Sequence, residues 1–283
     1  MKPLIGITAG CPCGVGPEVV AKAAVDPRVL QICSPRIFGR IDGPVPHEPK
    51  ECGGLSIKWL DEAIHAAMTG EISAIVTGPI DKSHWHEAGS TFAGHTDYLA
   101  HVTASHPVAM MMVSPDLKIG LVTTHVPISA VPQIITVQRI CDITKLVAGY
   151  PFSKSKKIAI CALNPHSGEL GLMGIEEDAI IKPAIELLQK EGLDVSGPYP
   201  ADTVFWRARH GEFGAVVAMY HDQALAAIKT LDFKNTVNVT MGLPFVRTSP
   251  DHGTASDIAG KGIADHENTV RAVELAVKLV NKK

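Results

Sequence analysis

Short apolar runs alternate with longer amphipathic segments along most of the chain, a pattern typical of βα units that build a mainly parallel sheet. The runs are four to seven residues long and mostly β-branched or small, as in strands buried on both faces. They predict strands at 3–8, 35–38, 73–77, 108–113, 118–123, 157–163, 214–219 and 236–240. The intervening segments predict helices at 17–30, 58–69, 95–104, 131–149, 175–191, 202–210, 222–230 and 267–281. The expected fold class is therefore α/β, with mainly parallel sheets flanked by helices.

The last predicted helix has the clearest amphipathic pattern, and we expect it to pack on the sheet. Its apolar face consists of Val270, Val273, Val277 and Val280. Glu176 and Glu177 fall in the first turn of another helix, where the macrodipole favours acidic side chains. Residues 39–54 are rich in Gly and Pro and predict a loop.

Composition bounds the class of protein. The 283 residues are 46% hydrophobic and 19% charged, which favours a globular chain with a substantial core. A net charge of −3 gives no basic footprint of a nucleic-acid binder. No apolar run approaches the roughly 18 residues of a membrane span, and the first predicted strand leaves no room for a signal peptide. We therefore expect a cytoplasmic protein without nucleic-acid or membrane partners.

The six cysteines do not have the density of a disulfide scaffold, so we expect reduced thiols. Cys141 and Cys161 lie inside apolar segments. Cys11 and Cys13 are separated by one residue, which is not the Cys-x-x-Cys spacing of redox or zinc motifs.

Three histidines lie where predicted strands stop, namely His125, His166 and His221. Ligands of open α/β sheets bind outside the carboxyl ends of the strands. Three imidazoles at one such edge would form a divalent-metal site with an open coordination position. Each histidine taken alone is also explained as a polar residue that opens a loop.

Other segments also carry candidate chemistry. The loop 10–18 follows the first strand, but its glycines match neither a dinucleotide fingerprint nor a Walker loop. Gly94-His95-Thr96-Asp97 opens a helix whose N-terminus could bind an anion, although helix capping is the favoured explanation of Thr96 and Asp97 taken alone. The segment 242–254 is a loop by composition, and Arg247 within it could bind a phosphate or carboxylate with two hydrogen bonds.

These segments together resemble the 4-hydroxythreonine-4-phosphate dehydrogenase family of pyridoxal phosphate biosynthesis, the PdxA-like proteins. The matching segments cover nearly the whole chain in order. They are Gly78-Pro-Ile, Gly94-His-Thr, Thr123-Thr-His, Leu163-Asn-Pro-His-Ser-Gly-Glu, Pro200-Ala-Asp-Thr, Met219-Tyr-His-Asp-Gln and the run 237–262. The family fold is similar to that of isocitrate and isopropylmalate dehydrogenases, which bind NAD without a Rossmann fingerprint. The resemblance thus implies two subdomains around a cleft, which we place at 1–94 plus 225–283 and at 95–224.

The resemblance also assigns roles to individual residues. It makes His125, His166 and His221 the metal ligands, with Asp202 beside the metal. The implied substrate contacts are His95, Thr96, Lys229, Asn238 and Arg247. The implied cofactor contacts are Gly242, Leu243, Pro244, Thr248, Ser249, Asp251 and Thr254. Asp202 is the candidate proton acceptor, and Lys229 would stabilise developing negative charge.

The implied activity is NAD- or NADP-dependent oxidation of 4-phosphooxy-L-threonine at C3, followed by decarboxylation to 3-amino-2-oxopropyl phosphate. The metal would be zinc, with magnesium or cobalt as alternatives. In the family the site forms at a dimer interface, which implies a homodimer with a shared active site; we place that interface, with most metal ligands, in the second subdomain. Two departures affect substrate choice: Cys11 and Cys13 replace the acid and the alanine of the family's Gly-Asp-Pro-Ala-Gly loop, and residues 33–57 look shortened.

Two rival functions stay open at this point. A paralogue would oxidise 4-phospho-threonate, 4-phospho-erythronate or a ring dihydrodiol. A hydrolase or lyase would use the three histidines without a nucleotide, but it calls for a general-base glutamate as in His-Glu-x-x-His, and that motif is absent. Glu169 is the nearest substitute.

Overall fold

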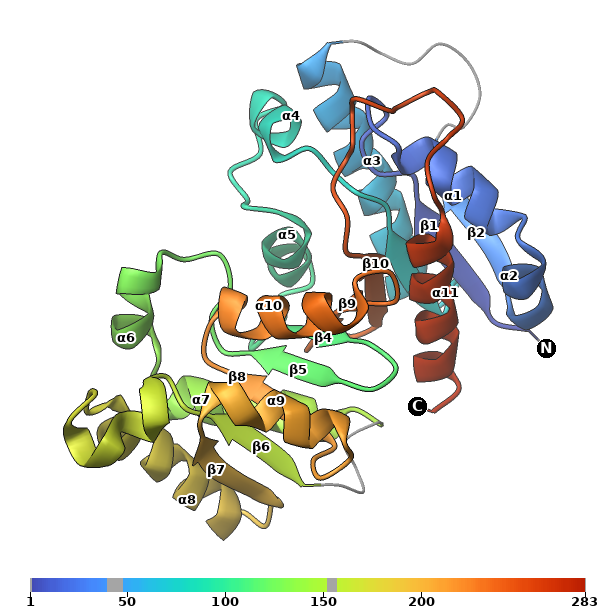
Figure 1. The fold of residues 1–283 in the computed structure, drawn as a ribbon. Helices are drawn as coiled ribbons and strands as arrows, with labels where there is room; N and C mark the ends of the chain where they lie inside the picture. The colour runs from blue at the N-terminus through green and yellow to red at the C-terminus, as the bar shows by residue number, and fades with distance from the viewer. Residues whose placement is uncertain (1, 40–47, 152–156, 283) are drawn as a thin grey trace. The chain divides into compact units, whose positions relative to one another are not determined.

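The chain forms two compact units in the computed structural model, which describes residues 2–39, 48–151 and 157–282 (Figure 1). Unit 1 consists of Met1–His106 and Lys234–Lys283, and unit 2 is Pro107–Phe233. The sequence-based boundaries lie 12 and 9 residues earlier (106 − 94 and 233 − 224), so His95 and Thr96 fall in unit 1. Unit 2 contains His125, His166 and His221.

The strands of unit 1 follow the order β2-β1-β3-β10-β9. The first four are mutually parallel, while β9 runs antiparallel to β10. Their bounds are β1 Leu4–Thr8, β2 Ser34–Phe38, β3 Ala74–Thr77, β9 Val237–Met241 and β10 Val246–Pro250. The C-terminal segment of the chain therefore supplies β10, which lies between β3 and β9.

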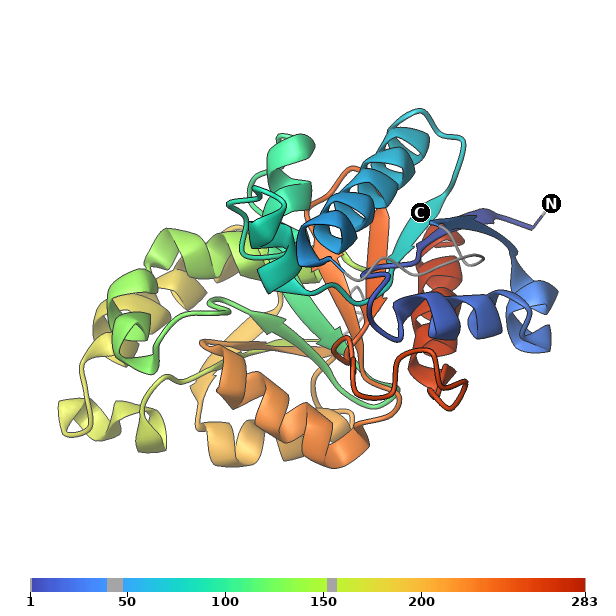
Figure 2. The same ribbon diagram turned by 90° about the horizontal axis from the view of Figure 1, so that it is seen from above.

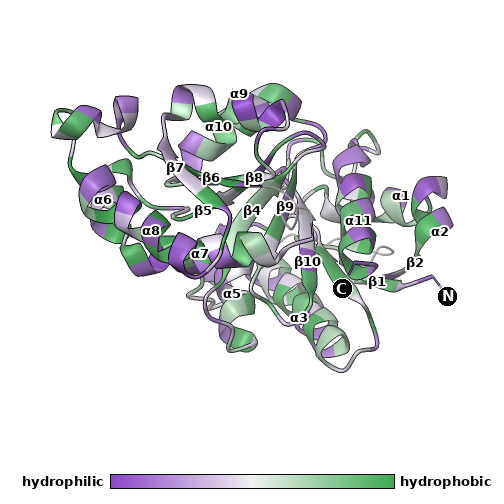
Figure 3. Cartoon of the chain, turned by 90° about the horizontal axis from the view of Figure 1, so that it is seen from below, coloured by the Kyte–Doolittle hydropathy of each residue, from purple (hydrophilic) through white to green (hydrophobic). Residues whose placement is uncertain are grey.

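Six helices belong to the described part of unit 1. They are α1 Gly16–Ala24, α2 Pro27–Ile32, α3 Pro49–Met68, α4 Lys82–Glu87, α5 His95–Val102 and α11 Glu267–Val280. Helices α3 and α11 lie on opposite sides of the strands (Figure 2). As predicted, α11 packs on the sheet: Val270 and Val273 are fully buried and Val277 is nearly so. Apolar and polar residues alternate around this helix in Figure 3.

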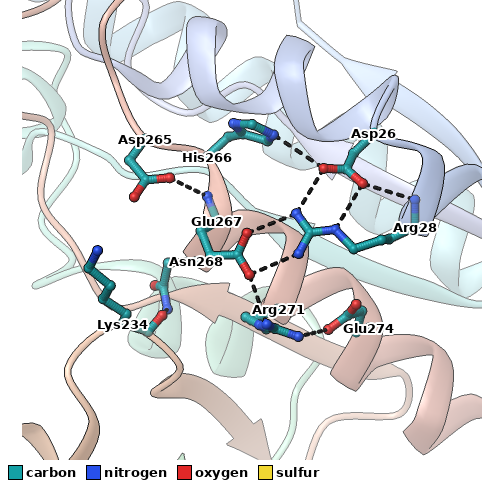
Figure 4. Close-up of polar contacts among 9 residues, drawn as sticks. All are labelled: Asp26, Arg28, Lys234, Asp265, His266, Glu267, Asn268, Arg271 and Glu274. Carbon is teal, nitrogen blue, oxygen red and sulfur yellow. Dashed lines mark hydrogen bonds and ion pairs between the residues drawn. The ribbon is translucent and has the colours of Figure 1, made fainter.

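A network of charged side chains joins the first turn of α11 to α2 (Figure 4). The guanidinium of Arg28 donates to both carboxylate oxygens of Asp26 and to both of Glu267 at 2.8–3.1 Å. Arg271 pairs with Glu267 and Glu274 at 2.9 Å. These bidentate contacts hold the pKa of Asp26 and of Glu267 below the ordinary values of their carboxyl groups.

The strands of unit 2 follow the order β4-β5-β8-β6-β7. β4 is antiparallel to β5, and the other pairs are parallel. The strands are β4 Ala109–Val113, β5 Lys118–Leu121, β6 Ile158–Cys161, β7 Val195–Tyr199 and β8 Ala215–Ala218. The α-helices are α6 Val131–Ile134, α7 Val137–Gly149, α8 Lys182–Lys190, α9 Ala201–Arg209 and α10 His221–Asp232. Helices α9 and α10 cover one face of these strands, with a core that includes Phe205, Val216 and Ile228, and α7 and α8 cover the other face (Figure 2).

Several sequence-based boundaries were wrong for physical reasons. β10 lies in a segment that was predicted to be a loop. It forms a strand because polar side chains such as Arg247 and Thr248 find buried hydrogen-bond partners. Helix α3 begins at Pro49, inside the predicted 39–54 loop, although two glycines follow. The predicted helix 131–149 is two helices, since Ile135 is extended. Strand β7 and helix α4 were not predicted.

The expectation of six reduced cysteines was also wrong. Cys13 and Cys52 form a disulfide across 39 residues of sequence, because the fold brings the loop after β1 to the first turn of α3. Cys11, Cys33, Cys141 and Cys161 are free and buried. Within the ranges described above, none of the helices has the length and apolar character that a membrane crossing requires.

Candidate functional site

The three candidate metal ligands of unit 2 follow three neighbouring parallel strands. His125 comes after β5, His221 after β8 and His166 after β6, and these strands are adjacent in the order β5-β8-β6. Parallel strands place their carboxyl ends at one edge of the sheet. The edge position expected from the apolar runs is therefore present in the fold.

His125 and His221 are direct neighbours. Their ring centroids are 5.5 Å apart, a separation that suits two imidazoles on one cation. The Nδ1 atom of His221 lies 2.6 Å from a carboxylate oxygen of Asp222. Ligating histidines commonly use one ring nitrogen for the metal and the other for a carboxylate. His221 thus has a held Nδ1 and an Nε2 available as a ligand.

Two side chains that the sequence reading missed position these histidines. Gln223 accepts from the Met219 N–H and donates to the Ala162 carbonyl, both at 2.7 Å, so it joins the end of β8 to the end of β6. Thr123 donates its hydroxyl to the Met219 carbonyl at 2.8 Å and fixes the chain just before His125. Gln223 follows His221 by two residues, and Thr123 precedes His125 by two. This close spacing to a candidate ligand is the sequence signal that could have identified them.

His166 lies in a tightly turned segment held by Glu177. The buried Glu177 carboxylate accepts from the backbone N–H groups of Leu163 and Asn164 at 2.9 and 2.7 Å. Glu177 also lies in the first helical turn, as predicted, so the backbone contacts are a further role of this side chain. His166 itself is exposed, with a φ of 50°. The ligand atoms of His166, His125 and His221 do not all lie within 4.8 Å of one another. Among the described residues, one group of three or more histidine, cysteine or acidic side chains meets that distance: Cys11, Cys13 and His84 in unit 1.

The two predicted catalytic residues also lie in unit 2. Asp202 is exposed in the first turn of α9. Lys229 is half-buried on α10, with its ammonium 5.5 Å from the ring centroid of Phe233. Their roles stay predictions.

Arg247 is the most unusual charge in unit 1. Its side chain is 2% exposed, and no residue of the described ranges forms an ion pair with it. It donates to the hydroxyls of Thr240 at 2.9 Å and Thr77 at 2.6 Å, while its Nε has no partner. Burial lowers the pKa of Arg247 to about 9. A buried guanidinium with a spare donor and no counter-ion is suited to bind an anionic ligand.

Further candidate substrate contacts share this part of unit 1. Arg247 pairs with Thr240 across β10 and β9, and Asn238 lies two residues away on the same face. The Oδ1 of Asn238 is buried without a partner. Burial and the nearby charges of Arg247 and Lys82 hold the pKa of His95 well below its usual value, so this imidazole is neutral at neutral pH. Two unsatisfied polar atoms thus occur on residues predicted to contact substrate; Thr77 and Thr240 were missed.

The remaining predicted contacts divide by environment. Thr96 is half-buried in the first turn of α5. The hydroxyl of Thr248 is directed to α11, where it donates to the Ala272 carbonyl, so it serves packing. Ser249 and Leu243 are buried, whereas Gly242, Asp251 and Thr254 are half-buried and Pro244 is exposed. The cofactor roles of this segment stay predictions.

Comparisons with known proteins agree with the resemblance. Residues 19–276 match the family model described as pyridoxal phosphate biosynthetic protein PdxA. A 4-hydroxythreonine-4-phosphate dehydrogenase from Desulfosudis oleivorans is 39% identical over 98% of this chain and 96% of its own length. A relative from Oceanobacillus iheyensis is provisionally named a D-threonate 4-phosphate dehydrogenase. It is 37% identical over 100% of this chain and 99% of its own length.

Solved structures extend the comparison to the fold. A 4-hydroxythreonine-4-phosphate dehydrogenase from Klebsiella pneumoniae matches with a TM-score of 0.85 at 32% identity, covering 99% of this chain and 100% of that one. A beta-decarboxylating dehydrogenase from Thermococcus kodakarensis matches with a TM-score of 0.52 at 14% identity, covering 99% of this chain and 84% of that one. This match confirms the expected fold. The alignment with the Desulfosudis relative spans 323 positions against 283 residues here, as expected for a shortened chain. The chain belongs to the PdxA family of pyridoxal phosphate biosynthetic proteins.

Proposed function

We propose that this protein oxidises 4-phosphooxy-L-threonine at C3 with NAD or NADP and decarboxylates the product to 3-amino-2-oxopropyl phosphate, in pyridoxal phosphate biosynthesis. The observation that carries the proposal is Arg247, a buried cation with an unpartnered Nε and with no counter-ion among the residues that the structure describes. A phosphate or carboxylate would supply the missing negative charge. The names of the 32–45% identical relatives supply the substrate class.

The anion-binding residues of unit 1 would hold the substrate. Arg247 donates to an anionic group, and the neutral His95 can donate or accept a hydrogen bond without repelling the guanidinium. Asn238 presents an unpartnered oxygen that suits an ammonium or hydroxyl donor. These three groups would orient the hydroxy acid rather than carry out its oxidation.

The histidines of unit 2 would hold a divalent metal, zinc before magnesium or cobalt. The 5.5 Å spacing of the His125 and His221 rings and the Asp222 carboxylate on His221 fit a metal-binding donor set, and His166 would be the third ligand. When bound, the metal supplies Lewis acidity and the nicotinamide supplies the hydride acceptor. Asp202 would accept the proton of the C3 hydroxyl, and Lys229 would stabilise negative charge during loss of carbon dioxide.

We further propose a cytoplasmic homodimer with a shared active site, and a cofactor that lies along residues 242–254. These assignments rest on the resemblance to the family, of which this chain covers nearly the full length.

The test is reduction of NAD or NADP, followed spectrophotometrically, with 4-phosphooxy-L-threonine and added divalent metal. We expect turnover in the wild type and at least a hundredfold loss in the His166→Ala, His221→Ala double variant. His210→Ala is the matched control, since His210 is an exposed histidine that contacts the Trp206 carbonyl. Full turnover in the double variant would remove the metal assignment. Faster turnover on D-threonate 4-phosphate would shift the substrate to the paralogue, and hydrolysis without nucleotide would favour the metal hydrolase.

A further inference from the structure

A second cluster of metal-binding side chains lies in unit 1, and none of its residues has an assigned role in the dehydrogenase. The ligand atoms of Cys11, Cys13 and His84 all lie within 4.8 Å of one another. The Sγ of Cys11 is 3.3 Å from the Nδ1 of His84. Cys52 adjoins the same group, because its sulfur is joined to that of Cys13. Two sulfur atoms and one imidazole nitrogen thus form the group, and the Cys52 sulfur is bonded to one of these sulfurs, so three separate segments meet here.

The surrounding backbone holds these segments in place. The loop after β1 is attached to the end of β3 by the Cys11 N–H, which donates to the Pro79 carbonyl at 2.8 Å. Helices α3 and α4 approach closely at Gly53, where a Cβ would lie 1.9 Å from the His84 carbonyl oxygen. The indole N–H of Trp85 donates to the buried Ser56 hydroxyl at 2.7 Å. Cys52 and His84 are therefore carried by two helices that are packed and hydrogen-bonded to each other.

The donor set is that of a Cys3His zinc site. Tetrahedral zinc with Zn–S near 2.3 Å and Zn–N near 2.0 Å places its ligand atoms roughly 3.3–3.8 Å apart. The ligand atoms of Cys11, Cys13 and His84 already lie within 4.8 Å of one another, and Cys52 would complete the set once its bond to Cys13 is reduced. The Nε2 of His84 lies 3.9 Å from a carboxylate oxygen of Asp81. Asp81 is itself held by the backbone N–H groups of Ser83 and His84. A ligating histidine is usually supported by a hydrogen bond from its second ring nitrogen to a carboxylate; Asp81 lies near that nitrogen but outside hydrogen-bond distance.

We propose that Cys11, Cys13, Cys52 and His84 bind one thiophilic divalent cation of the zinc type, and that the Cys13–Cys52 disulfide closes this site. A dithiol reductant transfers two electrons and two protons to the disulfide, which becomes two thiols while the reductant becomes a cyclic disulfide. Zinc then replaces three thiol protons, and His84 binds as the neutral imidazole. In the oxidised chain, two of the four ligands are bonded to each other and cannot bind as thiolates.

The experiment uses cobalt(II) as a spectroscopic substitute for zinc on the full chain. Protein reduced with a phosphine, under anaerobic conditions, is titrated with cobalt, and a sulfur-to-cobalt charge-transfer band reports thiolate ligation. The histidines proposed for the dehydrogenase carry no sulfur and do not contribute to this band. We expect the band to saturate by two cobalt per chain, because the histidines of unit 2 can take one cobalt without contributing to it, and to disappear on addition of excess zinc. Thiol titration after denaturation should count six thiols in this form and four after oxidation with diamide.

The variants separate the ligands from other cysteines. Cys11→Ser and Cys52→Ser should each weaken the band by the loss of one thiolate of three, whereas Cys33→Ser, at a buried cysteine that ends α2, should leave it unchanged. The comparison of reduced with oxidised wild type needs no variant, so it stands even if a variant does not fold. Absence of the band in fully reduced protein, an unchanged band in both ligand variants, or an equal band in the oxidised form would each overturn the proposal. None of these readings depends on dehydrogenase activity.

Discussion

Replacing Arg247 by Met should abolish anion binding while leaving the ligand-free protein about as stable as before, or more stable. Methionine has a similar length and fills the buried space without a charge. The guanidinium is 2% exposed and unpaired by any acid among the described residues, so folding must desolvate it without a counter-ion. Buried charges of this kind are retained for binding, not for stability.

The magnitude follows from the pKa of Arg247. Burial lowers it from 12.5 to about 9, and at about 1.36 kcal/mol per pKa unit the charged form costs roughly 5 kcal/mol on folding. The variant removes that cost but also removes two buried hydrogen bonds, those to the hydroxyls of Thr77 and Thr240, at about 1–3 kcal/mol each. The free energy of unfolding should therefore change by between about −1 and +3 kcal/mol.

The assay is urea unfolding at pH 7.5 with and without saturating phosphorylated substrate or inorganic phosphate. We expect ligand to stabilise the wild type and to have no effect on Arg247→Met, whose turnover should also be lost. Arg207→Met is the control, because Arg207 forms an exposed pair with Glu212 and should not change ligand binding. A loss of more than about 3 kcal/mol without ligand would refute the reasoning, since Arg247 would then contribute to stability. Unchanged ligand stabilisation would refute its role as the anion site.

Three further outcomes are expected. Asp222→Asn should lower metal affinity about 10–100-fold in equilibrium dialysis, because the carboxylate no longer supports His221; an unchanged affinity would separate Asp222 from the metal site. Glu177→Gln should reduce turnover and speed amide hydrogen exchange at Leu163 and Asn164, whose N–H groups lose a carboxylate acceptor; normal exchange there would contradict the positioning role. Asp26→Asn should remove part of the acid sensitivity of unfolding. The pKa of Asp26 is lower in the folded chain than its ordinary value, so its contribution is complete above about pH 4 and is lost as the pH falls further; parallel stability–pH curves for variant and wild type would contradict this.

The strand-end histidines show how far the sequence could lead. Apolar runs identified β5, β6 and β8, and the general rule for α/β sheets placed His125, His166 and His221 at their carboxyl ends. The order β5-β8-β6 depends on which strands pair, and local pattern does not encode pairing. The neighbouring rings of His125 and His221 became visible only in the fold.

β10 shows why the rest was missed. Val246-Arg-Thr-Ser-Pro reads as a polar loop, yet all five residues are buried. Distant residues supply hydrogen-bond partners for two of them, Thr77 for one nitrogen of Arg247 and the Ala272 carbonyl for Thr248. The Cys13–Cys52 pair is similar, because no spacing rule links residues 39 positions apart.

The origin of β10 has a consequence for the order in which the protein forms during synthesis. Unit 2 is one continuous stretch of chain and is complete once residue 233 has left the ribosome. Unit 1 must wait for the C-terminal 50 residues (283 − 233), since β9, β10 and α11 come from them. Until then β3 exposes an edge ready to pair with foreign strands. A nascent chain stalled before β10 should therefore contain a finished unit 2 and an unfinished, aggregation-prone unit 1.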